Sequence, residues 1–289
     1  MIFKKKRKGI ILAGGTGSRL YPLTQIVSKQ LLPVYNKPMI FYPLSVLMLA
    51  DIRDILIISD SINLPILKNF LGKGTQFGVN LSYALQKKPK GIAEALLIGE
   101  KFIDNSPVAL ILGDNIFFGH RFGDELKKIS LSELSNIFLY QVPDPERYGV
   151  VKLNSNDEVI DIIEKPKKPP SKYIVTGLYF YDSNAVKFAK KLKYSKRGEL
   201  EISDLNQIYL KNKALNSYFL SRGFNWYDTG TFDSLNDASN MIRVLEQRQN
   251  IRIGSPYEIA LRQKWISKKT IIAFSRKLNP MDLDYLLSI

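Results

Sequence analysis

Near its N-terminus the chain reads Ile10-Ile11-Leu12-Ala13-Gly14-Gly15-Thr16-Gly17-Ser18-Arg19-Leu20. A short apolar run, typical of a buried strand, leads directly into a glycine-rich bend, and a fixed positive charge follows at Arg19. Glycines let the backbone approach a ligand closely and point N–H groups toward it without interference from Cβ atoms. Because a guanidinium also suits planar and tetrahedral oxyanions, this stretch predicts a strand followed by a phosphate-binding loop.

Two better-known phosphate-binding loops do not match this stretch. The dinucleotide fingerprint needs a third glycine at the start of a helix, but Leu20 stands in that position when counted from Gly15. A Walker loop ends in Gly-Lys-Ser/Thr, which is absent from the stretch. A second cation, Lys29, follows instead, and two cations suit the several charges of a nucleoside triphosphate. Taken alone, Lys29 is equally compatible with a solvated loop lysine.

The pattern of apolar residues predicts an α/β protein. In the first half, expected strands at residues 9–12, 55–59, 79–84 and 108–112 alternate with expected helices at residues 39–50, 64–71 and 91–102. Such alternation is typical of a parallel sheet with helices on both faces. Closely spaced strands at residues 138–142, 149–153, 159–163 and 173–181 then predict a mixed or antiparallel extension.

Helices return in the last third of the chain. They are expected at residues 185–192, 204–211 and 232–248, with Thr231 as the N-cap of the last one. Two more are expected at residues 257–265 and 268–287, with an interruption at Pro280. We therefore expect one α/β domain over residues 1–250 and a C-terminal helical appendage over residues 251–289 that belongs to the same unit.

Composition excludes several classes of protein. The chain has no cysteine, which excludes disulfides, thiolate nucleophiles and thiolate metal sites and fits a cytoplasmic location. A single histidine, His120, argues against a histidine-based zinc site or a Ser–His catalytic pair. No stretch approaches the roughly 20 apolar residues of a membrane span, so no membrane partner is expected.

The formal net charge of +15 over 289 residues is high. The lysines are scattered and form no stripe with interleaved aromatic residues, which favours solvated faces over a nucleic-acid-binding surface, although attraction of polyanions stays an alternative. The charged start, residues 1–8, precedes an apolar run that is short for a signal peptide. We expect a solvated tail that leads into the first strand.

Longer motifs carry a resemblance to a known family. From Leu12 to Leu20, with Pro22, Lys29 and residues 31–33, the sequence resembles the signature of sugar-phosphate nucleotidylyltransferases, and residues 28–35 and 37–40 are similar to their glucose-1-phosphate thymidylyltransferase branch. Further blocks follow in the family's order: Leu112-Gly113-Asp114-Asn115, Asp144-Pro145-Glu146-Arg147-Tyr148-Gly149-Val150-Val151, Glu164-Lys165-Pro166, Thr176-Gly177-Leu178-Tyr179-Phe180-Tyr181, Arg197-Gly198-Glu199-Leu200-Glu201-Ile202, Trp226-Tyr227-Asp228-Thr229-Gly230-Thr231 and Arg262-Gln263-Lys264-Trp265. The match runs from about residue 8 to residue 265.

The resemblance implies a fold and a reaction. The expected fold is α/β, a Rossmann-like nucleotidyltransferase (GT-A-like) architecture with a mixed, mostly parallel central sheet flanked by helices. The expected reaction converts dTTP and α-D-glucose 1-phosphate into dTDP-glucose and pyrophosphate with Mg²⁺, the first step toward dTDP-rhamnose and related deoxysugars. The family is generally a homotetramer that dTDP-rhamnose inhibits at a second site between subunits.

The resemblance also implies roles for individual residues. It gives catalytic roles to Arg19, Lys29 and Lys165, and Mg²⁺ binding to Asp114 and Asp228. It gives nucleotide contacts to Gly14, Gly15, Thr16, Gly17, Gln30, Gln86, Gly91 and Asp114. It gives sugar-phosphate contacts to Tyr148, Gly149, Glu164, Lys165, Val175 and Arg197. The positions that resemble the family's second, regulatory site are Arg222, Glu258, Ile259 and Arg262.

Several of these residues have ordinary alternatives. Asp114 follows an expected strand, so its carboxylate is expected at the ligand-binding edge of the sheet, whereas Asp228 by itself fits an N-cap or turn aspartate. Glu164 and Lys165 fit an exposed hairpin ion pair, and Glu258 with Arg262 fits an i,i+4 helical pair.

One position departs from the family pattern. The family commonly has Gly-Leu-Ala-Gln-Ala where this chain has Gly-Ile-Ala-Glu-Ala, with Glu94 in place of glutamine. This leaves the preference for dTTP over UTP open. Uridylyl transfer, a non-catalytic sugar-nucleotide sensor and a nucleic-acid binder are the alternative functions.

Overall fold

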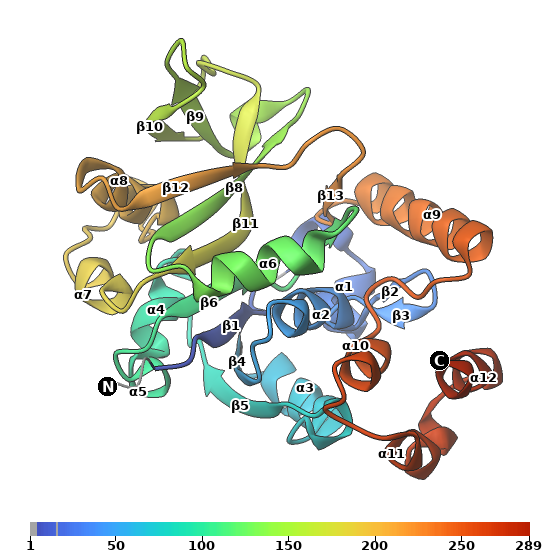
Figure 1. Ribbon diagram of the computed structural model, residues 1–289. Coiled ribbons are helices and arrows are strands. Elements are labelled where there is room, and N and C mark those ends of the chain that lie inside the picture. Colours follow the sequence, from blue (N-terminus) through green and yellow to red (C-terminus); the bar gives the residue numbers. More distant parts are fainter. Residues whose placement is uncertain (1–4, 16) are drawn as a thin grey trace.

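The computed structural model describes residues 5–15 and 17–289. Figure 1 shows a central sheet with helices packed on both of its faces. Over the described residues, the sheet has nine strands: β1 (Lys8–Leu12), β4 (Asp54–Ser59), β5 (Asn80–Leu85), β6 (Val108–Leu112), β8 (Ser135–Gln141), β9 (Gly149–Leu153), β10 (Val159–Glu164), β11 (Tyr173–Tyr181) and β12 (Leu215–Phe219). Its main path is β10-β9-β11-β6-β1-β4-β5, with β8 beside β11 and β12 beside β8.

The central four strands, β5-β4-β1-β6, are parallel, as the alternation of strands and helices predicts. β11 then pairs antiparallel with β6, and β8, β9 and β10 continue the antiparallel part. The expectation of a mixed sheet built around a parallel core is confirmed. Because β1 and β6 are parallel and Leu12 lies opposite Leu112, the loops that follow these two strands emerge at the same edge.

The helices are α1 (Leu23–Ile26), α2 (Phe41–Leu49), α3 (Asn63–Leu71), α4 (Glu94–Ile98), α5 (Glu100–Ile103), α6 (Phe122–Leu131), α7 (Ala185–Ala189), α8 (Ile202–Lys211), α9 (Phe232–Gln249), α10 (Pro256–Arg262), α11 (Lys268–Ala273) and α12 (Pro280–Ser288). Short 3-10 helices are η1 (Ser18–Leu20), η2 (Lys29–Leu31), η3 (Thr75–Phe77), η4 (Pro145–Arg147) and η5 (Ser275–Lys277).

Successive side chains of β1 enter different cores, because neighbouring residues of a strand point to opposite faces of the sheet. Ile11 packs in the core that α2, α3, α6 and α10 cover. Ile10 packs in the core that α4, α5, α7 and α8 cover. Both isoleucines are fully buried, and each such burial stabilises the fold by about 1.5–3 kcal/mol.

A third, smaller core lies beside the end of β1. Here α9 packs over two small sheets, β2 (Pro33–Val34) with β3 (Lys37–Pro38) and β7 (Asn115–Phe118) with β13 (Asn225–Asp228). Thr231 caps α9 as expected, since its side chain accepts a hydrogen bond from the backbone N–H of Ser234 and the Ser234 side chain reciprocates. This core fixes the segment that carries Asp228.

The C-terminal helices pack against the rest of the chain. The ring of Tyr257 in α10 lies 4.8 Å from the ring of Phe77, and Gln263 Nε2 donates to the carbonyl oxygen of Met48 at 2.9 Å. The helix expected at residues 268–287 is interrupted, as expected: α11 ends at Ala273, and Pro280 starts α12 with Asn279 as its N-cap. The division of the chain at residue 250 stays a prediction.

Two expectations about local structure are wrong. The helix expected at residues 91–102 is two short helices, α4 and α5, that meet at Gly99. The expected elements also leave out α6 and β12, which lie before and after the strand-rich middle.

The expected solvated tail is also only partly right. Residues 1–4 lie outside the described residues, and Lys5 and Lys6 are exposed, but Arg7 is buried. Its guanidinium donates hydrogen bonds to the carbonyl oxygens of Val108, Ser130, Ser132 and Tyr181. The prediction fails at Arg7 because these carbonyl groups come from three distant elements that only the fold brings together.

Candidate active site

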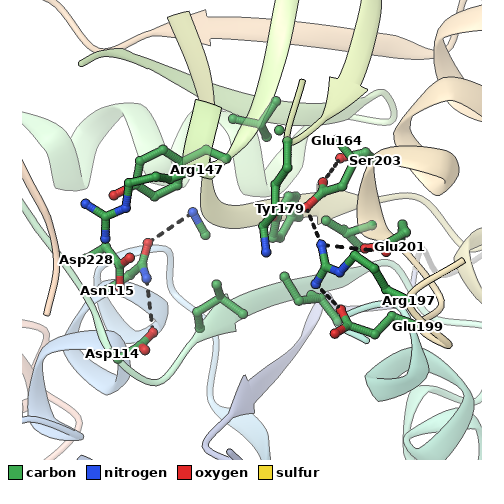
Figure 2. A pocket seen from close by; sticks show the side chains of 18 of the residues that line it. Asp114, Asn115, Arg147, Glu164, Tyr179, Arg197, Glu199, Glu201, Ser203 and Asp228 are labelled. Atoms are coloured by element: carbon green, nitrogen blue, oxygen red, sulfur yellow. Dashed lines mark hydrogen bonds and ion pairs between the residues drawn. The ribbon is translucent and has the colours of Figure 1, made fainter. Parts of the chain in front are cut away.

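A cavity of about 530 Å³ opens at the sheet edge where β1 and β6 end. Of the residues singled out in the sequence, it is lined by Arg19, Asp114, Tyr148, Gly149, Glu164, Lys165, Val175, Arg197 and Asp228. Figure 2 shows two groups of polar side chains across the cavity. One holds Asp114, Asn115, Arg147 and Asp228, and the other holds Glu164, Arg197, Glu199, Glu201 and Ser203.

The two aspartates come together through the small β7–β13 sheet. Asp114 lies between β6 and β7, and Asp228 is the last residue of β13. The antiparallel register places Asp228 opposite Asn115, the neighbour of Asp114. The N-cap of the following helix is Thr231, so the alternative of an N-cap aspartate at position 228 is wrong.

Asn115 holds this arrangement in place. Its Oδ1 accepts hydrogen bonds from Trp226 Nε1 at 2.8 Å and from the backbone N–H of Gly177 at 3.1 Å. Its Nδ2 donates to Asp114 Oδ1 at 3.1 Å. Because three elements meet on one buried amide, the carboxylate of Asp114 has a fixed direction.

The two carboxylates have opposite electrostatic surroundings. Burial alone would raise the pKa of Asp114, but the charge and hydrogen bond of the buried Lys29 ammonium outweigh it, and the pKa is lowered. Burial, and then the charge of Asp114, raises the pKa of Asp228, and Lys29, Arg19 and Arg147 offset this only in part. Lys29 is therefore no solvated loop lysine, and Asp228 carries the less compensated negative charge.

This pair suits a hard divalent cation. Mg²⁺ prefers carboxylate oxygens and usually keeps several oxygen ligands from substrate phosphates and water. In residues 5–15 and 17–289, no group of three or more His, Cys, Asp or Glu side chains could hold a metal ion. A metal at Asp114 and Asp228 would therefore take most of its ligands from the substrate, and it would relieve the repulsion that raises the pKa of Asp228.

The glycine-rich loop lies beside this pair. Gly15 and Gly17 lie between β1 and η1, and Thr16 lies outside the described residues. A Cβ added at Gly14 would lie 2.6 Å from Gln86 Oε1, so a larger residue there would displace the end of the Gln86 side chain. Arg19 is exposed, and a Cβ added at Gly230 would lie 2.8 Å from its Nη2 atom.

Three further residues, Gln30, Gln86 and Gly91, have expected nucleotide contacts. Gln30 is 2% exposed, and its Oε1 accepts a hydrogen bond from Ser28 Oγ at 3.0 Å. Gln86 is 4% exposed, and its Nε2 donates to Glu94 Oε2 at 2.8 Å. Gly91 has a φ of +100°, and a Cβ there would lie 2.3 Å from the carbonyl oxygen of Leu200, which excludes larger residues.

The opposite group of the cavity is built around Glu164. The β9–β10 register places Glu164 opposite Gly149, and the backbone N–H of Lys165 donates to the Tyr148 carbonyl oxygen at 2.9 Å. Ser203 Oγ donates to Glu164 Oε2. Glu164 thus pairs with Ser203 and Arg197 and not with Lys165, so the expected hairpin ion pair is wrong. Lys165 is exposed at the cavity wall.

Arg197 is surrounded by carboxylates. Its guanidinium lies 3.5 Å from Glu164, 2.7 Å from Glu199 and 3.8 Å from Glu201. Val175 of β11 completes the wall of the cavity, at 8% exposed. The arrangement offers carboxylates for hydroxyl groups and cations for a phosphate within one hollow.

Sequence reasoning gave no role to Arg147, Asn115 or Ser203, which line the cavity. Arg147 lies in a motif block that the sequence singles out, next to Tyr148, but nothing local marks its charge as part of the site. Trp226 is buried and also lines the cavity.

The residues of the expected regulatory site lie apart from this cavity. Arg262 Nε and the Tyr285 hydroxyl each donate to Glu258 Oε1 at 2.8 Å, so the helical pair in α10 is confirmed. Ile259 lies between Glu258 and Arg262 in α10 and is partly buried. Arg222 lines a separate hollow of about 650 Å³ with Tyr140, Tyr173 and Phe219. Their regulatory role stays a prediction.

Comparisons with known proteins agree on one family. Residues 8–244 match the model of the family described as nucleotidyl transferase. A glucose-1-phosphate thymidylyltransferase from Neisseria meningitidis is 53% identical over 272 residues, which is 94% of each chain.

Solved structures give the same picture. A crystal structure of a Bacillus anthracis protein, provisionally assigned as a glucose-1-phosphate thymidylyltransferase and bound to sucrose, is 43% identical. It superposes with a TM-score of 0.77 over 87% of this chain and 98% of that one. A UDP-glucose pyrophosphorylase with bound UDP-glucose is more distant, at 26% identity and a TM-score of 0.73 over 83% of this chain and 99% of that one. Within the part of the chain that the structure describes, no helix is long and apolar enough to cross a membrane.

Proposed function

The chain belongs to the glucose-1-phosphate thymidylyltransferases of the nucleotidyl transferase family, and from this premise we propose that it makes dTDP-glucose and pyrophosphate from dTTP and α-D-glucose 1-phosphate. One observation carries the proposal. The β7–β13 register brings Asp228 beside Asp114 at the edge where the glycine-rich loop emerges. That edge is where open α/β sheets bind ligands.

The chemistry is a displacement at phosphorus. An oxygen of the sugar phosphate attacks the α-phosphorus of dTTP in line, the bond from that phosphorus to the bridging oxygen breaks, and pyrophosphate leaves on the opposite side. The nucleophile is already an anion, so no general base is needed. This agrees with a cavity whose lining includes no histidine among the described residues.

The obstacle is repulsion between two anions, and the chain's cations oppose it. Arg19 and Lys29 flank the loop and suit the triphosphate. Lys165 and Arg197 line the other part of the cavity and suit the sugar phosphate. The carboxylate of Glu164, held by Ser203, is a good acceptor for a sugar hydroxyl.

Asp114 and Asp228 would hold Mg²⁺. When bound, the ion would neutralise phosphate charge and align the two substrates. The opposed pKa shifts of the two aspartates support this assignment, because Lys29 compensates one carboxylate and leaves the other for a second cation.

The base preference is part of the proposal. The high identity to thymidylyltransferases and the lower identity to UDP-glucose pyrophosphorylases favour dTTP over UTP. The intact set of Arg19, Lys29, Asp114, Lys165 and Asp228 favours a working enzyme over a non-catalytic sensor.

The test is a pyrophosphate-release assay on the purified chain with glucose 1-phosphate, Mg²⁺ and each of dTTP, UTP and CTP. We expect the highest kcat/KM with dTTP and no release without the metal. No release with any nucleotide would favour the sensor, and a clear preference for UTP would favour uridylyl transfer. A specific footprint on DNA or RNA, with no pyrophosphate release, would favour the nucleic-acid binder.

The family resemblance extends the proposal to a cytoplasmic homotetramer that dTDP-rhamnose inhibits. Glu258, Ile259 and Arg262 in α10, with Arg222, are the proposed regulatory contacts. Sedimentation would measure the assembly, and inhibition assays with Arg262→Ala would test the second site. An unchanged inhibition constant in that variant would remove Arg262 from the proposal.

A further inference from the structure

A second cavity, of about 690 Å³, is lined by the segment from η5 to α12, the end of α3, the β2–β3 hairpin and the start of α10. Figure 1 shows where these elements lie, at the C-terminal end of the chain. Among the residues that the structure describes, it shares none of its lining with the active-site cavity, and Glu258, Ile259 and Arg262 do not line it. Pockets of this size hold small ligands, mostly through apolar contacts and a few well-placed polar groups.

Aromatic rings make up much of the lining of this cavity. The ring of Phe41 stacks on the ring of Phe70 at 5.7 Å and meets the ring of Phe77 edge-on at 5.6 Å. Phe70 is still 44% exposed, and Phe274 supplies a further, partly exposed ring from the C-terminal segment. Exposed aromatic rings in a cavity offer stacking contacts to a planar ring of a ligand.

Two exposed lysines, Lys73 and Lys277, line the same cavity. Each follows a phenylalanine of the lining closely in the sequence: Lys73 follows Phe70, and Lys277 follows Phe274. The Nζ atom of Lys277 lies 6.0 Å from the centre of the Phe274 ring. Among the described residues, neither ammonium has a carboxylate partner. Unpaired cations beside open aromatic rings suit an anionic group on the ligand.

The other charges of the cavity are already compensated. Lys37 Nζ donates to Glu246 Oε1 at 2.7 Å, and both side chains are buried. Arg252 Nε donates to Asp282 Oδ1 at 2.7 Å. The positive charge of the two exposed lysines therefore stays uncompensated, which suits a ligand group with about two negative charges.

A buried hydroxyl in the lining also lacks a partner. Tyr257 lines the cavity, is 7% exposed, and packs its ring 4.8 Å from the ring of Phe77. Within the described part of the chain, its hydroxyl makes no hydrogen bond. Burial raises the pKa of this hydroxyl, so it keeps its proton at neutral pH. Because buried tyrosine hydroxyls usually have a partner, this group is available to a ligand.

We propose that this cavity binds a small ligand that combines a planar aromatic ring with a phosphate group. The ring packs against Phe41 and Phe70, and the phosphate contacts Lys73 and Lys277. The Tyr257 hydroxyl donates a hydrogen bond to an oxygen of the ligand. A phosphate is favoured over a carboxylate because its two charges match the two lysines. The inference does not depend on the proposed function.

The probe is 1-naphthyl phosphate, and its dissociation constant is measured by calorimetry on the full chain. For the wild type we expect a constant of about 0.1 mM. The double variant Lys73→Gln, Lys277→Gln should bind the probe about 10-fold more weakly, and 1-naphthol, which lacks the phosphate, should bind the wild type about 10-fold more weakly than the probe. No saturable binding up to about 5 mM, as expected if a second copy of the chain covers the cavity, overturns the proposal. A double variant with the wild-type constant overturns it as well.

The matched control is the double variant Lys68→Gln, Lys269→Gln. It removes two exposed lysines from α3 and α11, close in sequence to the tested ones, but neither lines the cavity. Its constant should stay within about twofold of wild type, because exposed charges outside the cavity are screened. An equal loss of binding in this control would assign the effect to net charge, and the proposal would be wrong. Lys29→Met should also keep the wild-type constant, and a loss of binding there would place the probe in the active site and overturn the proposal.

Tyr257→Phe tests the hydroxyl with the ring packing retained. Since the hydroxyl has no partner within the described part of the chain, the variant should unfold at the wild-type urea concentration or higher. It should bind 1-naphthyl phosphate about fivefold more weakly. An unchanged constant would contradict the proposed hydrogen bond. Turnover enters none of these measurements, so a failure of the proposed function would leave their outcome unchanged.

Discussion

The ammonium of Lys29 donates a hydrogen bond to Oδ2 of Asp114, which lines the cavity. The lysine side chain is 9% exposed and the aspartate side chain 24% exposed. Burial penalises both charges, so the pair persists because each compensates the other. Under the proposed function, the same ammonium would contact the triphosphate of a nucleotide while a metal ion takes its place on the carboxylate of Asp114.

Replacing Lys29 by methionine, which has a similar length and no charge, should lower kcat for dTDP-glucose synthesis by about 100- to 1000-fold. The loss follows from removing a buried cation beside the phosphates. Steady-state pyrophosphate release measures it. Lys68→Met, an exposed lysine of α3, is the control and should retain wild-type turnover. Turnover within about threefold of wild type in Lys29→Met would remove Lys29 from the catalytic set.

The same substitution should change how stability depends on pH. In the wild type, the lowered pKa of Asp114 gives stability that is present above its ordinary value of 3.8 and is lost as the pH falls through the lower folded value. Without Lys29, burial dominates and raises that pKa, so the ionised carboxylate destabilises the fold as the pH rises through the new value. Urea unfolding between about pH 4 and about pH 8 should show the deficit of Lys29→Met growing with pH. A deficit that is constant over this range would contradict the pairing.

Asp228→Asn should lower the turnover of the enzyme without lowering the stability of the fold. Burial and the charge of Asp114 raise the pKa of Asp228, so ionised Asp228 destabilises the fold as the pH rises through its folded pKa. Near pH 7 the variant should therefore unfold at the same or higher urea concentration than wild type. Its Mg²⁺-dependent turnover should fall by about 1000-fold, because the metal loses a carboxylate.

The control for this substitution is Asp237→Asn, an exposed aspartate of α9. It should leave both turnover and the unfolding midpoint close to wild type. A clear loss of stability in Asp228→Asn would mean that the ionised carboxylate has a structural partner, and the metal assignment would then be wrong.

The contrast between Asp114 and Asp228 shows what the sequence can predict about this site. Asp114 follows β6, whose apolar run predicts both the strand and the edge at which it ends. Asp228 belongs to a four-residue strand that pairs with β7, more than one hundred positions away in the sequence. A two-strand pairing of that separation leaves no periodic pattern, so only the family resemblance pointed to Asp228.

Other details were hidden for related reasons. The charged residues around Arg7 have the sequence pattern of a solvated tail. The burial of Arg7 depends instead on carbonyl oxygens at the ends of β6, β11 and α6, which the local sequence does not show. Gly99, where α4 and α5 meet, lies close to Ile10, and a Cβ added there would be 2.9 Å from Ile10 Cδ1. Local propensity cannot report such tertiary contacts.

Lys165→Ala should weaken use of the sugar phosphate selectively. The side chain lines the same cavity as Arg197 and follows Glu164 directly in the chain. Loss of one charged hydrogen bond should raise KM for glucose 1-phosphate by about 10- to 100-fold. KM for dTTP should stay within about threefold of wild type. Lys167→Ala, exposed two residues further on, should change neither constant, and an equal rise of both constants in Lys165→Ala would contradict the assignment.

Arg7→Met should destabilise the fold without touching the active site. The guanidinium is 8% exposed, and its hydrogen bonds join the end of α6 to the ends of β6 and β11. Burial lowers the pKa of Arg7 to about 10, so the side chain is still charged at neutral pH. Methionine would leave several buried carbonyl oxygens without donors, at a cost of about 3 kcal/mol in the free energy of unfolding.

Arg7→Lys tests whether charge or shape provides this stability. A lysine keeps the charge but cannot reach carbonyl oxygens from several elements with one planar group. It should therefore recover less than half of the stability that Arg7→Met loses in urea unfolding, whereas Lys6→Met, at an exposed neighbouring position, should stay within about 0.5 kcal/mol of wild type. Full recovery by Arg7→Lys would show that the buried charge alone, and not the shared hydrogen bonds, holds the three elements together.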